Sequence, residues 1–259
     1  MDLQLTGKRA IVTGGSKGIG LAVAKALIAE GAAVAIAARE VTALQAAAAS
    51  IGAIAIEVDT ADEESVDRMV ATAVERLGGV DILVNSAAEA ATPGSTGFMD
   101  QSDEEFRRQF EVKVLGYVRC ARAVAPHLIE QGWGRIVNVS GLAARQTGST
   151  IGSIRNIAVA AMTKNIADEI GHLGVNVTAV HPGLTRTERT VGMTATLAAD
   201  WGVDVAEVER RLAAKVSIGR IVSAEEVASV VAFLASPLSV AINGDSIPVG
   251  GGALGSIHY

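Results

Sequence analysis

Cysteine and aromatic residues are scarce in this chain. Cys120 is the only cysteine among 259 residues, so no disulfide can form within the chain and a reducing cytosol is compatible with its fold. Aromatic residues make up 3% of the sequence while hydrophobic residues make up 49%. The core must therefore be built from Ala, Val, Ile and Leu, whose small side chains let helices pack closely against a sheet.

Long apolar runs and blocks of positive charge are also missing. No stretch reaches the roughly 18 apolar residues of a membrane span, and Met1–Arg9 lacks the apolar core of a secretory signal, so we expect a cytoplasmic protein. The formal net charge is −6 with dispersed Lys and Arg, which argues against nucleic-acid and membrane partners and favours a small-molecule substrate. The four histidines lack metal-ligand spacing, so we expect no metal site.

Short β-branched runs alternate with Ala-rich amphipathic stretches from Arg9 almost to the end, without a Pro- or Ser-rich linker. This alternation predicts one α/β domain over 1–259: a doubly wound, Rossmann-like parallel sheet of about seven strands with helices on both faces. The predicted strands are Arg9–Thr13, Ala33–Ala37, Ala53–Val58, Ile82–Asn85, Arg135–Ser140, Asn176–His181 and Ser246–Val249. The predicted helices are Gly18–Gly31, Val41–Ser50, Asp62–Leu77, Asp103–Gln131, Ser153–Leu173 and Ala224–Ala235. Residues 184–217 show no strand pattern and are predicted to be an insert that covers the substrate.

A glycine-rich turn follows the first predicted strand and opens the first predicted helix. Such a turn needs glycine where φ is positive, where a pyrophosphate comes close, and where helix and strand touch. The helix N-terminus then offers free N–H groups and partial positive charge to phosphates. The turn therefore predicts a dinucleotide site, the alternative being a tight loop without a ligand. The predicted cofactor residues are Gly14, Ser16, Lys17, Gly18, Ile19 and Gly20.

The end of the second predicted strand indicates which dinucleotide binds. An acidic residue there would accept hydrogen bonds from the two ribose hydroxyls of NAD, but Ile36-Ala37-Ala38-Arg39 contains none. Arg39 could clamp a 2′-phosphate with its guanidinium fork, and Lys17 could add a second cation. NADP is therefore favoured over NAD, although either cation could be an ordinary solvated surface charge.

Several motifs together resemble the short-chain dehydrogenase/reductase family over essentially the whole chain. They are Thr13–Gly20, Val58-Asp59-Thr60, Asn85-Ser86-Ala87-Ala88, Gly134–Ser140, His181-Pro182-Gly183 with Thr187, and Val249–Gly252. The resemblance implies that Asp59 and Thr60 lie near the adenine and that Asn85 and Ala87 lie beside the ribose. It places Pro182, Gly183, Thr185 and Thr187 around the nicotinamide. It also implies a homo-oligomer, a dimer or tetramer, formed through the long helices 103–131 and 153–173, with 257–259 in a contact.

The catalytic tetrad is where this chain departs from the family. In the family a Tyr, four residues before a Lys, exchanges the alcohol proton; a phenol with a pKa of about 10 needs that neighbouring ammonium to act as a base at neutral pH. No Tyr occurs between Tyr117 and Tyr259. Alignment of the following segment places Gly152 at the Tyr position and Asn156 at the Lys position.

Two further tetrad positions are changed. Gly141 replaces the usual Ser, which leaves Ser140 as the nearest hydroxyl, and Lys113 replaces the usual Asn. Lys113 and Asn156 thus look like an exchange of residue types, in which Lys113 supplies the cation from the other helix. The alternative is that Lys113 points to solvent or fills a gap left by a lost water chain.

The remaining candidates have narrower roles. Arg155 is always protonated, so it could bind a substrate carboxylate or carbonyl but could not move a proton. His181 is expected to be a hydrogen-bonded core or rim histidine, and Tyr117 is expected at a subunit contact. Ser140, Lys113, Asn156 and Arg155 are the predicted catalytic residues.

Two functions are compatible with this sequence. The first is an NAD(P)-dependent oxidoreductase with a non-standard catalytic site, which transfers hydride between nicotinamide and a small carbonyl or alcohol. The alternative is a catalytically inactive NADP-binding protein that acts as a sensor or as a partner in a hetero-oligomer. The retained cofactor residues and the polar groups near the expected nicotinamide favour the oxidoreductase.

Overall fold

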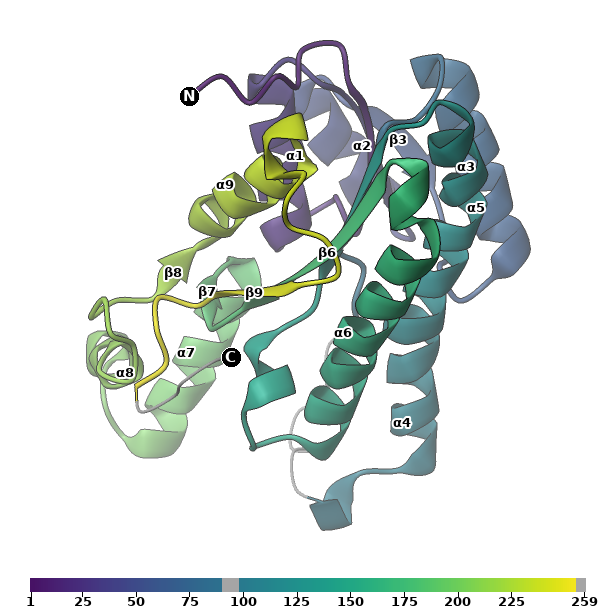
Figure 1. Cartoon of the computed structure of the whole chain (residues 1–259). Coiled ribbons are helices and arrows are strands. Elements are labelled where there is room, and N and C mark those ends of the chain that lie inside the picture. Colours follow the sequence, from purple (N-terminus) through teal and green to yellow (C-terminus); the bar gives the residue numbers. More distant parts are fainter. Residues whose placement is uncertain (90–97, 255–259) are drawn as a thin grey trace.

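A parallel sheet forms the centre of the molecule. The computed structural model describes residues 1–89 and 98–254, and within them seven strands pair in parallel in the order β3-β2-β1-β4-β5-β6-β9 (Figure 1). The strands are β1 (Arg9–Thr13), β2 (Ala33–Ala38), β3 (Ile54–Glu57), β4 (Ile82–Asn85), β5 (Gly134–Val139), β6 (Val175–Pro182) and β9 (Ser246–Val249). The expected doubly wound sheet is confirmed.

The central strands are apolar on both faces because helices cover both. Every residue of β4, β5 and β6 is buried, which explains why these segments read as continuous apolar runs instead of alternating ones. The expected strand limits agree with the structure to within a residue or two, as in β3, which spans Ile54–Glu57 where Ala53–Val58 was expected.

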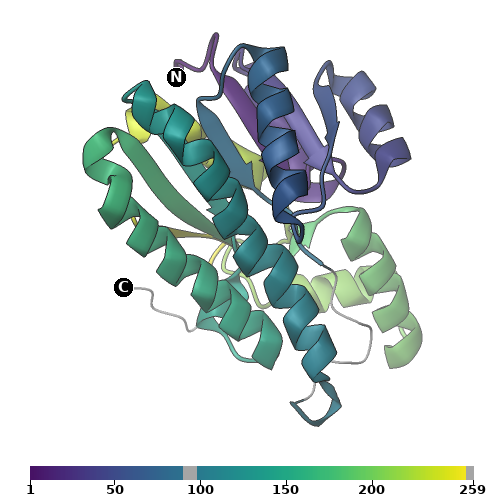
Figure 2. The same cartoon turned by 90° about the vertical axis from the view of Figure 1, so that its right-hand side faces the viewer.

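Helices pack on the two faces around separate hydrophobic clusters. The helices are α1 (Gly18–Ala29), α2 (Val41–Ile51), α3 (Glu63–Leu77), α4 (Asp103–Phe110), α5 (Gly116–Glu130), α6 (Thr150–Ile170), α7 (Glu188–Trp201), α8 (Val205–Ala213) and α9 (Ala224–Ala235). Leu27, Leu44 and Val231 bring α1, α2 and α9 onto one face of the sheet. Met69, Leu128 and Ile170 bring α3, α5 and α6 onto the other face, where Figure 2 shows these three helices side by side.

The expected helix 103–131 is interrupted by a wider turn. A π-helical segment, η2 (Glu111–Leu115), joins α4 to α5, and Figure 2 shows the whole as one long rod. Single π-turns inside α-helices occur frequently at functional sites. Helix α6 begins at Thr150 instead of the expected Ser153, because the Ser149 hydroxyl accepts a hydrogen bond from Gly152 N at 3.1 Å and caps the helix.

The segment 184–217 contains a strand that its sequence pattern did not predict. β7 (Thr185–Arg186) pairs in parallel with β8 (Val222–Ser223), and α7 and α8 follow β7. Two-residue strands are too short to produce a recognisable periodicity. This pairing starts α7 beside the first turn of α1, since a Cβ built on Gly18 would lie 3.6 Å from Thr187 Cγ2.

Close backbone approach shapes the glycine turn after β1. Gly14 and Gly18 have positive φ of 67° and 57°, which L side chains rarely adopt. A Cβ on Gly20 would lie 2.3 Å from Gly14 O, and a Cβ on Gly14 would lie 2.8 Å from Ala87 N. The turn therefore tolerates no side chain at either position.

Among the described residues, no helix combines the length and hydrophobicity needed to cross a bilayer.

We predict that Gly20→Ala destabilises the protein by about 2 kcal/mol, the usual cost of overpacking against atoms that cannot move away. Gly192→Ala in α7 is the matched control, because nothing lies within 4 Å of a Cβ there and alanine favours the helix. Urea unfolding of both variants measures the difference. Equal stabilities of the two variants would show that the turn can relax around a methyl group.

Candidate functional site

The candidate site begins at the carboxyl ends of β1 and β4. β1 lies between β2 and β4, so the chain leaves the sheet in opposite directions here, and ligands of open α/β sheets bind at such a switch point. Thr13 Oγ1 accepts hydrogen bonds from Ser86 N at 3.2 Å and Ala87 N at 3.4 Å. The glycine turn and the loop after Asn85 therefore lie together, as the sequence predicted.

The first turn of α1 already binds a carboxylate. Gly18 N donates to Glu188 Oε2 at 3.2 Å. Lys17, the exposed residue before α1, makes no side-chain cap, so the N–H groups of the turn are left for other partners. Ser16 and Ile19 are half-buried within the same turn. Glu188 was not predicted, because nothing in the sequence relates a residue at the start of α7 to the turn after β1.

A cavity of about 580 Å³ lies on the other side of the glycine turn, at the ends of β2 and β3. Arg39, Ala61, Glu89, Glu104, Arg107, Arg108, Glu111 and Val112 line it. Asp59 Oδ1 accepts from Ala61 N at 3.0 Å, and buried Thr60 donates through Oγ1 to Val112 O at 3.3 Å. Asp59 and Thr60 therefore brace the wall of the cavity in which Arg39, the expected phosphate ligand, is found.

Three of the four predicted catalytic residues come together at the end of β5. Lys113, in the π-turn η2, is buried and donates through Nζ to Ser140 O at 2.9 Å. Ser140 Oγ in turn donates to Asn156 O of α6 at 3.1 Å. The alternative that Lys113 points to solvent is therefore wrong.

Arg155 lies apart from this group. It donates to the Gln109 side chain of α4, and its Nε is buried without a hydrogen-bond partner among the described residues. Burial lowers the pKa of Lys113 well below 10.5, and the positive charge of Arg155 lowers it further. An amine of this kind can exchange a proton at a pH where an exposed lysine stays charged.

Gly141 and Gly152, which the sequence aligns with the family's Ser and Tyr, have little room for a side chain. A Cβ on Gly152 would lie 2.9 Å from Ser149 Oγ, and one on Gly141 would lie 3.0 Å from Asn156 Nδ2. Asn156 Oδ1 is buried without a hydrogen-bond partner within the described ranges, which is an unusual state for a buried acceptor.

Tyr117 does not take the place of the missing phenol. It is fully buried and donates its hydroxyl to Val139 O at 3.0 Å, so the expectation of a subunit contact is wrong: its position on α5 faces β5. Burial raises the pKa of Tyr117, which makes it a poor acid or base. His181 is a hydrogen-bonded core histidine in β6, whose Nδ1 accepts from Gly141 N at 3.4 Å.

A buried chain of polar side chains links the two ends of the site. Asn85 Nδ2 donates to Asn138 Oδ1 at 3.0 Å, and Asn138 Nδ2 donates to Thr163 Oγ1 at 2.9 Å. Asn85 Oδ1 is buried without a partner in the described part of the chain. Sequence reasoning missed Asn138 and Thr163 as a pair, although an asparagine inside an apolar strand was a signal for a buried hydrogen bond.

The residues expected around the nicotinamide form the link from β6 to α7. Pro182 ends β6, and Gly183 N donates to Val249 O at 3.2 Å. Thr185 Oγ1 donates to Gly183 O at 3.0 Å and Thr187 precedes α7 as its N-cap. The link therefore has a fixed backbone that passes beside Gly18.

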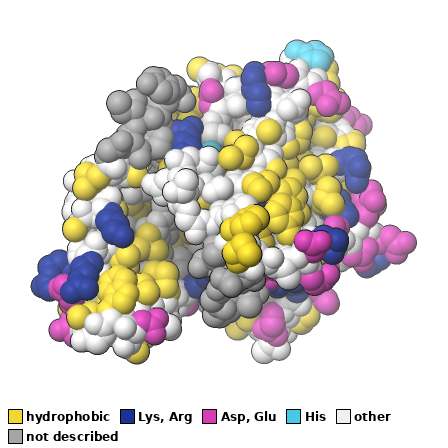
Figure 3. Space-filling view, turned by 90° about the horizontal axis from the view of Figure 1, so that it is seen from below, with side chains coloured by type: hydrophobic (Ala, Val, Ile, Leu, Met, Phe, Trp, Pro, Cys, Tyr) yellow, Lys and Arg dark blue, Asp and Glu magenta, His cyan; other side chains and the backbone are white. Residues whose placement is uncertain are grey.

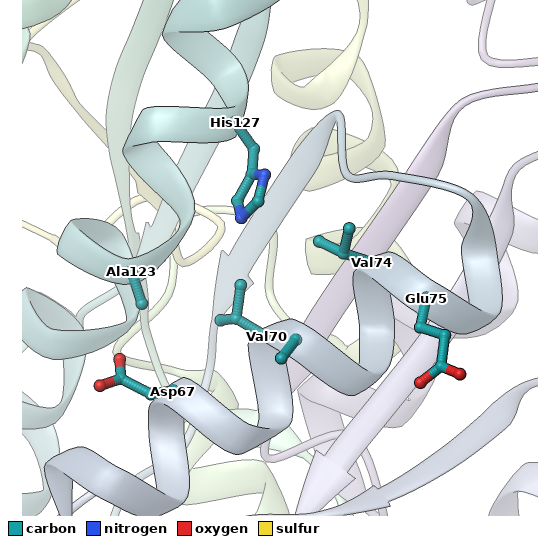
Figure 4. A pocket seen from close by; sticks show the side chains of 7 residues that line it. Asp67, Val70, Val74, Glu75, Ala123 and His127 are labelled. Carbon is teal, nitrogen blue, oxygen red and sulfur yellow. The ribbon is translucent and has the colours of Figure 1, made fainter.

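A second cavity of the described residues is more apolar. A cavity of about 410 Å³ between α3 and α5 is lined mainly by apolar side chains, with Asp67, Glu75 and His127 around them (Figure 4). It lies on the outside of the helix layer, away from the strand ends. The described residues contain no group of His, Cys, Asp or Glu that could hold a metal ion.

Comparisons with known proteins point to one family. A family model described as Enoyl-(Acyl carrier protein) reductase matches residues 14–253. The short-chain reductase protein NovJ of Streptomyces niveus is 37% identical over 94% of this chain and 92% of its own length. The sorbitol dehydrogenase of Cereibacter sphaeroides is 35% identical, over 96% of this chain and 98% of its own.

Solved structures agree over the full chain. L-sorbose reductase from Gluconobacter frateurii, complexed with NADPH and L-sorbose, is similar with a TM-score of 0.92 at 31% identity, covering 99% of this chain and 100% of that one. Actinorhodin polyketide ketoreductase with NADPH is similar with a TM-score of 0.86 at 32% identity, covering 94% and 96%.

The lowered pKa of Lys113 predicts a pH-dependent stability. Between its pKa in the folded protein and 10.5, the unfolded chain holds a proton on Lys113 that the folded protein lacks, so stability rises with pH by up to about 1.4 kcal/mol per unit. Below that pH window, burial of Lys113 lowers the free energy of unfolding by a constant amount. Above pH 10.5 this loss of stability disappears, because Lys113 is neutral in both the folded and the unfolded state. Lys113→Met removes this dependence, so the free energy of unfolding of the wild type relative to the variant should rise as pH rises. Denaturant titrations at several pH values measure it, and a pH-independent difference would contradict the prediction.

Proposed function

The chain belongs to the short-chain dehydrogenase/reductase family of NAD(P)-dependent oxidoreductases, and from that premise we propose that it is NADP-dependent and transfers hydride between nicotinamide and a small carbonyl or alcohol. The observation that carries the proposal is the buried group of Lys113, Ser140 and Asn156 beside an intact dinucleotide turn. The alternative of an inactive NADP-binding protein is not favoured, since the relatives are named dehydrogenases and reductases.

The cofactor fits the residues of the turn. Gly18 N already donates to a carboxylate, which shows that an anion is stable at the start of α1, and glycine at 14 and 20 leaves the close approach that a pyrophosphate needs. In the proposal Gly14, Ser16, Gly18, Ile19 and Gly20 hold the pyrophosphate. Lys17 and Arg39 recognise the 2′-phosphate.

The same proposal assigns the rest of the cofactor site. Asp59 and Thr60 flank the adenosine cavity, and Asn85 and Ala87 hold the ribose. Pro182, Gly183, Thr185 and Thr187 flank the nicotinamide, which when bound supplies or accepts the hydride.

Proton transfer is assigned to Lys113. In its protonated form Lys113 gives a proton to the substrate oxygen during reduction and becomes a neutral amine; in its neutral form it takes the alcohol proton during oxidation and becomes an ammonium. Ser140 fixes the amine through its carbonyl, and the free Asn156 Oδ1 offers an acceptor for a substrate hydroxyl. Arg155 keeps the pKa of Lys113 low by its positive charge. This arrangement replaces the phenol–ammonium pair of the family with one buried amine.

Two further features belong to the proposal. The segment 184–217 covers the substrate, because it starts directly after Gly183 and includes Thr185 and Thr187, which are assigned to the nicotinamide. A homo-oligomer forms through the two long helices, which carry exposed Leu115, Ile154 and Ile157. Figure 3 shows hydrophobic side chains gathered in separate groups on the face seen from below, with charged side chains around them. The expected contact of 257–259 lies outside the described residues.

Replacing the amine tests the proposed chemistry. Lys113→Met should lower kcat by about 10²-fold or more, the usual contribution of general acid–base catalysis, while the Kd of NADPH stays within about two-fold. Lys113→Arg should be equally inactive, since a guanidinium does not exchange its proton. Lys164→Met is the control, because Lys164 is exposed on α6 and pairs with Asp168. Full turnover of the Lys113 variants with a panel of ketones, followed at the nicotinamide absorbance, would contradict the assignment.

The carboxylate at the start of α1 should compete with the cofactor. Glu188→Gln is expected to lower the Kd of NADPH by about two- to five-fold, since a charge at a helix N-terminus contributes about 0.3–1 kcal/mol that phosphate must replace. Glu209→Gln is the matched control, as Glu209 lies in the same segment but pairs with Arg186. Fluorescence titration measures both, and an unchanged or higher Kd in Glu188→Gln alone would refute the competition.

A further inference from the structure

Glu89 joins two arginines across the mouth of the adenosine cavity. One oxygen of its carboxylate accepts from Arg39 Nη2, and the other accepts from Arg108 Nη1 at 3.0 Å. The three residues come from the end of β2, the loop after β4, and α4. The Glu89 side chain is 13% exposed whereas that of Arg39 is 56% exposed, so the acid is held in place and the arginine is free to move.

This arrangement means that the predicted phosphate ligand already has a partner. Arg39 must release Glu89, in whole or in part, before its guanidinium can take up a new anion. Glu89 is not left unpaired when this happens, because Arg108 continues to bind its other oxygen. A phosphate monoester carries nearly two negative charges and three acceptor oxygens, so it competes well with a single carboxylate for a guanidinium.

We propose that Glu89 determines cofactor specificity: it holds Arg39 when no 2′-phosphate is bound, and Arg39 exchanges Glu89 for the 2′-phosphate while Arg108 retains Glu89. The inference rests on the proposed function, which assigns this cavity to the adenosine end of NADP. Since NAD makes no demand on Arg39, the free energy needed to release Glu89 from Arg39 opposes the binding of NADP and does not affect the binding of NAD. Glu89 therefore narrows the preference of the site for NADP over NAD.

The test compares two adenosine phosphates that differ only in the group concerned. Calorimetry gives the Kd values of 2′,5′-ADP and 5′-AMP for the wild type and for Glu89→Gln. We expect Glu89→Gln to tighten 2′,5′-ADP by about two- to five-fold, the range of an exposed ion pair, with a smaller change for 5′-AMP. Glu104→Gln is the control, because it removes one negative charge from the same cavity and leaves the Arg39–Glu89 pair in place. It should therefore leave the ratio of the two Kd values near that of the wild type.

A double-mutant cycle separates the role given to Arg108 from direct contact with phosphate. Arg108→Leu should weaken 2′,5′-ADP in the wild type, because Glu89 would lose its second partner, and should have little effect in the Glu89→Gln background. Arg107→Leu is the control, since Arg107 lines the same cavity but pairs with Asp103. An equal loss from Arg108→Leu in both backgrounds would overturn the exchange, because Arg108 would then bind the phosphate itself.

The outcomes distinguish this inference from the proposed function. If the folded wild type binds neither nucleotide nor NADPH, the cofactor assignment fails and the inference fails with it. If the wild type binds 2′,5′-ADP but Glu89→Gln and Glu104→Gln give the same Kd ratio, only the inference fails. Circular dichroism of each variant confirms that it is folded before the comparison is made.

Discussion

The close contact between the glycine turn and the end of β4 is the constraint on which the site depends. Backbone atoms of Gly14, Gly20 and Ala87 approach so closely that a single added carbon at Gly14 or Gly20 would clash with main chain. This contact orients the first turn of α1, with its N–H groups, at the switch point of the sheet between β1 and β4. The position that binds an anion is therefore fixed by backbone geometry, and side chains decide only which anion binds there.

Carboxylates of the protein bind an N–H group at the start of α1 and a guanidinium at the end of β2, two positions of the proposed cofactor site. Glu188 bonds to the first turn of α1 and Glu89 bonds to Arg39. Both arrangements satisfy groups that would otherwise be left to water. Under the proposed cofactor assignment, phosphate binding is an exchange of one anion for another, so the net affinity reflects the difference between two interactions and is smaller than either.

At the other end of the site, burial changes the chemistry of a residue whose type alone would indicate a permanent cation. Lys113 lies in a π-turn that directs its amine toward the end of β5, where it donates to a carbonyl and, among the described residues, forms no ion pair with a carboxylate. Desolvation therefore favours its neutral form. The family's phenol needs a separate ammonium to lower its pKa, whereas here burial and Arg155 act on the amine directly.

The sequence by itself determined the parallel sheet, the glycine turn and most element limits, because apolar runs, helix caps and positive-φ glycines are local properties of the chain. The proposal that Lys113 and Asn156 are exchanged residue types also came from the sequence and stays a prediction. Only the tertiary structure decided that Lys113 is buried against Ser140, that Tyr117 belongs to the core, and that Glu89 pairs with Arg39 and Glu188 with Gly18 N. Those outcomes depend on contacts between residues far apart in the chain. Periodicity and spacing are local patterns, so they do not indicate which distant side chains contact each other at the ends of the strands.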